Sequence, residues 1–243
     1  MRTVISSGHT DSSRIKTVGS PRGFTLIEIL TAVFILSIVV SLVMGSFGGI
    51  FEGADHINLG TDLHEMGSAC MNRIANDLKA IHVASYPRYS PPDIDDDPEL
   101  YHIKGESRNV GGDYYGWLRF TSMAHLPFNH RANEGIAQIV YYAQQTPEND
   151  IILRRADTLY PYPEEFEESE TDPILCEQVR KFELVYIDND GDEHEGWDSE
   201  SDDNEYSTPR AIGIKLSVGT EDLSYAFLTK ITLPSYRFKE VKR

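Results

Sequence analysis

The distribution of apolar residues divides the chain into one long uncharged run and several shorter segments with regular periodicity. No charged residue occurs between positions 29 and 51. This run is long enough for a helix that crosses a bilayer, which takes about 20 apolar residues. A carboxylate, Glu28, stands immediately before the run. Because a charge is costly to bury in lipid, Glu28 is a candidate functional residue, although a side chain near a helix end can also reach the headgroups.

A second helix pattern follows the uncharged run. Apolar residues recur every three or four positions, which predicts an amphipathic helix that continues from the membrane segment and ends before Pro87. Gly53, Gly60 and Gly67 are expected to weaken its middle. The apolar stripe consists of Leu59, Leu63, Met66, Cys70, Ile74, Leu78 and Ile81.

The second half of the chain alternates apolar and polar residues, the pattern of half-buried strands. Strands are predicted at residues 117–121, 136–142, 151–155, 179–187, 211–218 and 225–233. Residues 86–113 are rich in proline, glycine and acids, and they predict a long surface loop that includes the run Asp95-Asp96-Asp97. Residues 164–170 predict another acidic loop. One long helix followed by mostly antiparallel strands gives the α+β fold class.

The charge balance excludes several partners. The formal net charge is −17. Nucleic-acid binding needs a basic surface, so no nucleic-acid partner is expected. Adhesion to anionic headgroups is disfavoured for the same reason. About 160 residues follow the N-terminal helix, enough for one domain with its own core.

The residues before the uncharged run carry a positive excess. Residues 1–23 contain Arg2, Arg14, Lys16 and Arg22 against Asp11. This excess predicts a cytoplasmic N-terminus and a C-terminal body on the other side of the membrane. The junction Gly23-Phe24-Thr25-Leu26-Ile27-Glu28 resembles the signal of the type IV prepilin and pseudopilin family. Subunits of that family assemble into helical filaments.

The resemblance implies a processing site and an assembly residue. A prepilin peptidase would cleave between Gly23 and Phe24, and the new amine of Phe24 would be N-methylated. Glu28 would pair with the Phe24 amine of a neighbouring subunit in the filament core, where a carboxylate needs a cationic partner. The implied organisation is a cleaved leader at 1–23, a transmembrane and filament-core helix at 24–51, an amphipathic periplasmic helix at 52–85, and a periplasmic β-rich domain of pilin-like fold at 86–243.

The body of the chain narrows the resemblance. Its segments 135–142, 153–155, 182–186, 196–197 and 209–212 look like the J-type minor pseudopilin of type II secretion systems. That family implies an inner-membrane protein that helps to initiate and cap the pseudopilus at its tip. Its implied partners are inner-membrane lipid, the I- and K-type minor pseudopilins and the major pseudopilin. The alternatives are a minor pilin of a type IV pilus or uptake system, and a membrane-anchored periplasmic module that binds calcium or another ligand.

One acidic segment is a calcium candidate. Asp188, Asp190 and Asp192 alternate side-chain oxygens, which a hard cation prefers. An EF-hand counted from Asp188 would need glycine and glutamate where Glu193 and Ser199 stand. The competing interpretation is a turn between two strands. The following acids, 198–203, are expected to form a mobile loop. No other cofactor is expected.

The cysteines and histidines give no catalytic or metal motif. Cys70 and Cys176 are the two cysteines, and an oxidising compartment would permit a disulfide between them. Cys70 falls on the apolar helical stripe, so a buried free thiol is the other interpretation. The eight histidines show no zinc spacing, and no nucleophile or phosphate-loop motif is present. We therefore expect no enzymatic activity.

Overall fold

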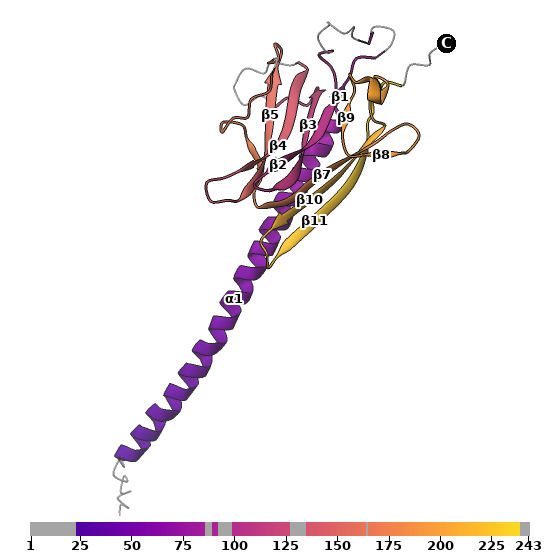
Figure 1. The fold of residues 1–243 in the computed structure, drawn as a ribbon. Coiled ribbons are helices and arrows are strands. Elements are labelled where there is room, and N and C mark those ends of the chain that lie inside the picture. The colour runs from indigo at the N-terminus through magenta and orange to yellow at the C-terminus, as the bar shows by residue number, and fades with distance from the viewer. Residues whose placement is uncertain (1–22, 86–88, 92–98, 127–134, 164, 239–243) are drawn as a thin grey trace, which may run out of the picture. The chain divides into compact units, whose positions relative to one another are not determined.

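The computed structural model describes residues 23–85, 89–91, 99–126, 135–163 and 165–238, without the side chains of 47–56 and 58. The leader residues 1–22 and the run Asp95-Asp96-Asp97 lie outside the described residues. A long helix, α1 (Leu26–Lys79), precedes all the described strands (Figure 1). The chain divides into two compact units, residues 1–55 and 56–243, and α1 contributes to both.

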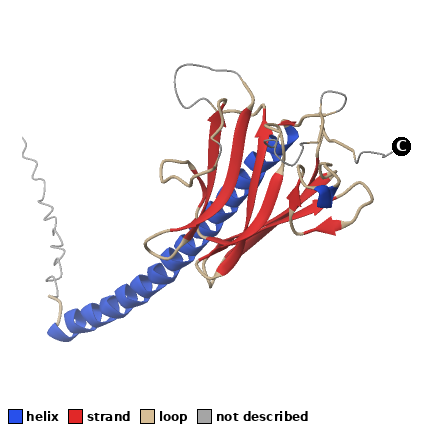
Figure 2. Cartoon of the chain, turned by 45° about the horizontal axis from the view of Figure 1, so that its top comes forward, coloured by secondary structure: helices blue, strands red, loops and turns tan. Residues whose placement is uncertain are grey.

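The second unit contains two antiparallel sheets (Figure 2). The larger sheet has the order β6-β5-β4-β3-β2-β9, and β1 pairs with β3 beside this path. Its strands are β1 (Ile81–His82), β2 (Lys104–Val110), β3 (Asp113–Ser122), β4 (Ala137–Gln145), β5 (Ile151–Leu159), β6 (Ile174–Cys176) and β9 (Trp197–Asp198). The smaller sheet has the order β11-β10-β7-β8, from β7 (Val179–Ile187), β8 (Glu193–His194), β10 (Ala211–Gly219) and β11 (Ser224–Thr232). The predicted α+β class is confirmed.

The core lies where both sheets meet the second part of α1. Cys70, Ile74 and Leu78 point from one helix face into this core and are fully buried. The strands contribute the inward half of each alternating pattern, for example Phe120 from β3 and Phe182 from β7. The predicted amphipathic stripe therefore packs from Leu63 onward, whereas its first member, Leu59, is 40% exposed. Ile81 is also buried, but it belongs to β1 because the helix ends at Lys79 and the chain then pairs with β3.

Two glycines of α1 act as contact points for β11. A Cβ at Gly67 would overlap the ring of Phe227, and a Cβ at Gly60 would lie 2.9 Å from the hydroxyl of Tyr225. The ring of His64, between these glycines, contacts both aromatic rings. Glycine lowers the helix propensity at these positions, but its missing side chain allows the aromatic side chains to approach the helix closely.

The predicted loop at 86–113 is wrong for its last third. Residues 104–110 form β2, which pairs with β3 in unbroken register from Lys104↔Arg119 to Val110↔Asp113. The strand escaped prediction because its buried position is Gly105, against which Tyr186 packs, and its other residues are polar or partly exposed. At its buried position β2 contributes no side chain to the core and instead leaves room for one from another strand. Its sequence therefore lacks the apolar alternation that marks other strands.

A buried charge network joins α1 to the larger sheet. Asp77 is fully buried, and its carboxylate bonds to Arg73 one turn away, to the hydroxyl of Tyr141 and to Arg155. The Arg155 Nε lies 2.7 Å from Asp77 Oδ2, and Arg155 Nη1 lies 2.6 Å from Asp157 Oδ2. The network therefore satisfies both ends of a guanidinium that is 2% exposed.

The pKa values follow from these contacts. Burial alone would lower the pKa of Arg155, but its bonds and charge interaction with Asp77 raise it above the usual range. Burial alone would raise the pKa of Asp157, but bonds from His125, the Leu126 N–H and Arg155 bring it below the usual range. Both side chains therefore stay charged near neutral pH. Because the folded pKa of Asp157 is depressed, its contribution to stability is present above its unfolded pKa and is lost as pH falls through the folded one.

We predict that Asp77→Asn destabilises the domain by about 3 kcal/mol, the lower end for a broken buried pair, because Arg155 keeps Asp157 as a partner. The melting temperature should fall by roughly 6–12 °C for a domain of this size. Thermal unfolding of the full chain in detergent measures the change. Asp62→Asn, an exposed acid on the same helix, is the matched control and should stay within about 0.5 kcal/mol of wild type. Equal melting of the two variants would contradict a structural role for the pair.

Candidate functional site

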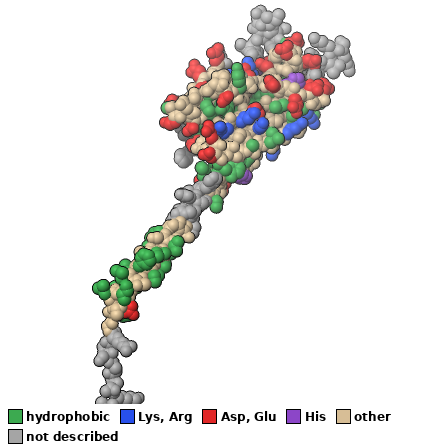
Figure 3. Space-filling model, turned by 60° about the horizontal axis from the view of Figure 1, so that its bottom comes forward, with side chains coloured by type: hydrophobic (Ala, Val, Ile, Leu, Met, Phe, Trp, Pro, Cys, Tyr) green, Lys and Arg blue, Asp and Glu red, His purple; other side chains and the backbone are tan. Residues whose placement is uncertain are grey.

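The N-terminal part of α1 presents an apolar surface that the rest of the described chain does not cover. The helical span Leu26–Ser46 has 21 residues and a mean hydropathy of 2.7, and none of it is buried. Hydrophobic side chains surround this part of the helix, whereas carboxylates are frequent on the domain (Figure 3). A surface of this size marks contact with a membrane or another protein. The span is long and apolar enough to cross a bilayer.

Three hydroxyl groups in this span, those of Thr31, Ser37 and Ser41, are satisfied within the helix. Thr31 donates to the carbonyl of Ile27 at 2.7 Å, and Ser41 donates to the carbonyl of Ser37 at 2.8 Å. Ser37 donates in the same way to the preceding turn. These side chains can therefore enter lipid or a filament core without leaving a donor unpaired.

Glu28 has a local role that the sequence analysis did not include. Its carboxylate accepts hydrogen bonds from the backbone N–H and the hydroxyl of Thr25, both at 2.9 Å. The Glu28 N–H donates to the hydroxyl of Thr25 at 3.4 Å in return. This is a capping box, with Thr25 before the first helical turn and Glu28 at its third position. The motif T-x-x-E is present in the sequence, but it lies inside the string that resembles a processing signal and was interpreted only as part of that signal.

The predicted cleavage point lies directly before this cap. Gly23 and Phe24 precede the helix, and both are exposed. Phe24 is 84% exposed. A Cβ at Gly23 would meet no described atom within 4 Å. The fold of the described residues therefore places no steric demand for glycine at this position, so such a demand would have to come from an enzyme that binds the junction.

The calcium candidates form a turn between β7 and β8. Asp188 Oδ1 accepts the backbone N–H groups of Asp190, Gly191 and Asp192, each at 2.9 Å. Burial alone would raise the pKa of Asp188, but these bonds and His194 bring it below its usual range. Gly191 has φ +95°, which glycine adopts without strain. The geometry is that of the competing turn interpretation, and calcium binding stays a prediction.

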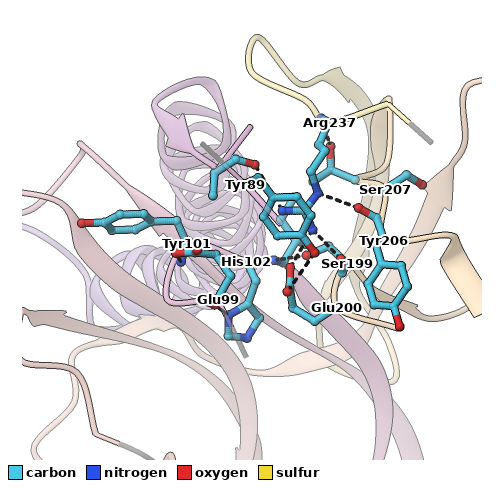
Figure 4. Close-up of polar contacts among 12 residues, drawn as sticks. Tyr89, Glu99, Tyr101, His102, Ser199, Glu200, Tyr206, Ser207 and Arg237 are labelled. Carbon is cyan, nitrogen blue, oxygen red and sulfur yellow. Dashed lines mark hydrogen bonds and ion pairs between the residues drawn. The ribbon is translucent and has the colours of Figure 1, made fainter. Parts of the chain in front are cut away.

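The acids after this turn form regular contacts in the structure, whereas the sequence predicts a mobile loop there. A short 3-10 helix, η1 (Asp202–Asn204), lies within them, and Ser199 is fully buried. Arg237 holds the segment from the C-terminal side (Figure 4). Its Nη2 lies 2.6 Å from Glu200 Oε1, and its Nε donates to the carbonyl of Tyr206 at 2.5 Å.

The same arginine connects this segment to the chain that follows β1. Its guanidinium lies 3.3 Å from the centre of the Tyr89 ring and donates to the carbonyl of Ala84 at 3.2 Å. The hydroxyl of Tyr89 completes the triangle by donating to Glu200 at 3.1 Å. Sequence reasoning missed this cluster because its bonded partners are 31 to 153 positions apart along the chain and no local pattern relates them. The charge of Glu200 in this acidic segment is therefore paired with a buried arginine through a charge-assisted hydrogen bond.

Cys70 and Cys176 are brought together. Both are buried in the same hydrophobic core, and both are free thiols in the structure. Among the described residues, no group of three or more His, Cys, Asp or Glu side chains is arranged to hold a metal.

Comparison with known proteins agrees with the N-terminal geometry. Residues 20–44 match the family described as the prokaryotic N-terminal methylation motif, and the match includes Gly23, Phe24 and Glu28. A structural comparison finds a type IV-like pilin from Thermus thermophilus at 10% identity and a TM-score of 0.40, covering 71% of this chain and 97% of that chain. No curated protein matches the chain by sequence.

The chain thus carries a type IV prepilin-like signal at the start of an apolar helix. The signal implies processing by a prepilin peptidase, anchoring in a membrane and assembly with pilin-like subunits. It indicates a structural, non-enzymatic class of protein.

We predict that Gly23→Val prevents cleavage, because a branched side chain would occupy the peptidase pocket next to the scissile bond. Immunoblotting of cells that produce the full chain should show the precursor alone. Intact-mass measurement should find no species beginning at a methylated Phe24. Gly19→Val, which lies before the matched motif, is the control and should be processed normally. Normal mature protein from Gly23→Val would refute the assignment of the junction.

Proposed function

We propose that the protein is a J-type minor pseudopilin of a type II secretion system, which helps to start and cap the periplasmic pseudopilus at its tip. The observation that carries the proposal is the uncovered apolar helix that begins at a methylation motif. A helix of this kind stays in the inner membrane before assembly and enters the core of a filament afterwards. The basic residues of the leader support a cytoplasmic N-terminus and a periplasmic domain.

The body of the chain supports the choice of subunit. The segments that resemble the J-type family fall on regular elements of the domain: β4, β5, β7, β9 and the start of β10. Many residues of these segments are buried. Among them, Arg155 belongs to the network around Asp77, and Trp197 is 4% exposed and donates to the carbonyl of Ser207. Because these residues are buried, the resemblance concerns the internal architecture of the domain and not a particular surface.

The proposed function is tested by recovering the assembled partners of the full chain. The tagged protein is produced in cells with the complete secretion system, cross-linked and purified in detergent. We expect the I- and K-type minor pseudopilins and the major pseudopilin to be recovered with it. Gly23→Val, which should remain a precursor, is the control that must not recover assembled partners. Recovery of pilins from an extracellular pilus instead, with no pseudopilin, would replace the proposal by the minor-pilin alternative.

We predict that Glu28→Ala is cleaved normally but assembles at least about tenfold less, because removal of a charged partner from a low-polarity core costs several times RT. The cross-linked fraction in high-mass species measures assembly.

Glu28→Gln separates the two roles of this side chain. Glutamine at this position keeps the capping box but carries no charge. If pairing with a neighbouring amine is the role, Glu28→Gln should assemble as poorly as Glu28→Ala. Wild-type assembly of Glu28→Gln would show that the cap is sufficient and that the charge pair is not required.

A further inference from the structure

The only two cysteines of the chain lie in the same hydrophobic core although they are far apart in sequence. Cys70 lies on α1 and Cys176 ends β6, and their exposed fractions are 0% and 1%. A hydrogen bond between their neighbours brings the two segments together: the N–H of Glu177, which follows Cys176, donates to the sulfur of Met66 at 3.4 Å. Met66 lies one helical turn before Cys70 on the same face. The end of β6 therefore lies against the turn of α1 that carries Cys70.

Strand β6 needs an attachment beyond its backbone pairing. It has three residues, stands at the edge of the larger sheet, and pairs only with β5, as Leu153↔Cys176 and Arg154↔Ile174. The register shifts between these two pairs, and Ile174 is 48% exposed. So short and irregular an edge strand gains little from its ladder. Cys176 is the one buried residue of this strand, and Leu175 is partly buried against the same core.

We propose that Cys70 and Cys176 form an intramolecular disulfide that fastens α1 to the edge of the larger sheet. The proposal rests on the proposed function to the extent that an oxidising periplasm receives the domain. The oxidant is the disulfide of a thiol–disulfide oxidase. One thiolate attacks that disulfide to give a mixed disulfide, and the second thiolate displaces the oxidase. The two thiols lose two protons and two electrons, the Sγ–Sγ bond forms, and the oxidase becomes a dithiol.

The burial of the pair determines when the bond forms. In the folded domain the contact with Cys176 and the burial of Cys70 raise the pKa of the Cys70 thiol, so little thiolate is available. Neither sulfur is accessible to an oxidase in that state. Oxidation therefore precedes the docking of β6 onto α1, and the folded core afterwards protects the bond from reduction. The closed loop spans more than a hundred residues, which is the range where cross-linking constrains the unfolded chain most.

The experiment counts thiols in the full chain inside the producing cells. Cells are quenched with acid, the protein is denatured, and a maleimide polymer is added with or without prior reduction. We expect no adduct without reduction, two adducts after it, and a monomer on a non-reducing gel. Cys70→Ser should give one adduct and calibrates the shift. Two adducts on unreduced protein whose N-terminus is the mature Phe24, or a disulfide-linked dimer, would overturn the proposal.

A second arm separates this proposal from the proposed function. If the leader is uncleaved, the purified full chain is unfolded and refolded in a glutathione buffer poised to oxidise. An intramolecular bond formed there supports the pairing, although the cellular location is then wrong, and two free thiols overturn it. The oxidised chain should also melt roughly 10 °C above the Cys70→Ala/Cys176→Ala variant in detergent, as expected for a long closed loop. Equal melting temperatures for the two would count against a stabilising bond.

Discussion

The packing of the domain depends on how one helix buries a carboxylate. Asp77 lies on the same stretch of α1 as the fully buried Ile74 and Leu78, and a charge there is tolerated only with complete hydrogen bonding. Arg155 and Tyr141 reach it from β5 and β4, so the requirement selects one rotation of the helix over the sheet. A purely apolar helix face could slide by a turn with smaller loss. The network therefore supplies specificity to a contact whose energy comes mainly from apolar burial.

Glycine and aromatic residues set the distance of closest approach between the smaller sheet and the elements beside it. Phe227 enters where Gly67 has no side chain, and Tyr186 enters where Gly105 has none. In each case a large side chain from the smaller sheet fills space left by a glycine on a neighbouring element. At these two positions the sequence analysis misjudged the contribution of glycine to the fold. Gly67 was counted as a weakness of the helix and Gly105 as part of a loop, because propensity scales describe the residue and not the partner that fills its space.

The sequence predicted those strands that contain a local cluster of apolar residues. The strands β3, β4, β5, β7, β10 and β11 were all predicted. Burial alternates along β7, whereas β4 and β5 are buried through most of their length, as short apolar runs also indicate. The processing signal was equally readable, since it is a continuous string. What escaped prediction depends on residues far apart: the pair of Asp77 with Arg155, the cluster around Arg237, and the short β6 that is held by its neighbours. No local pattern encodes a guanidinium and the carboxylate that it will meet.

The polar groups at the two ends of α1 are satisfied in different ways, one locally and one by distant residues. Near Glu28 the helix has no covering from its own chain, so its cap must be satisfied locally, and Thr25 and Glu28 do this within one turn. Near Asp77 the helix is enclosed, and its charge is satisfied by distant strands. The part of α1 that carries Cys70, Ile74 and Leu78 is thus held to the sheets by both apolar burial and charge pairing, and the proposed covalent link from Cys70 to β6 would lie within it.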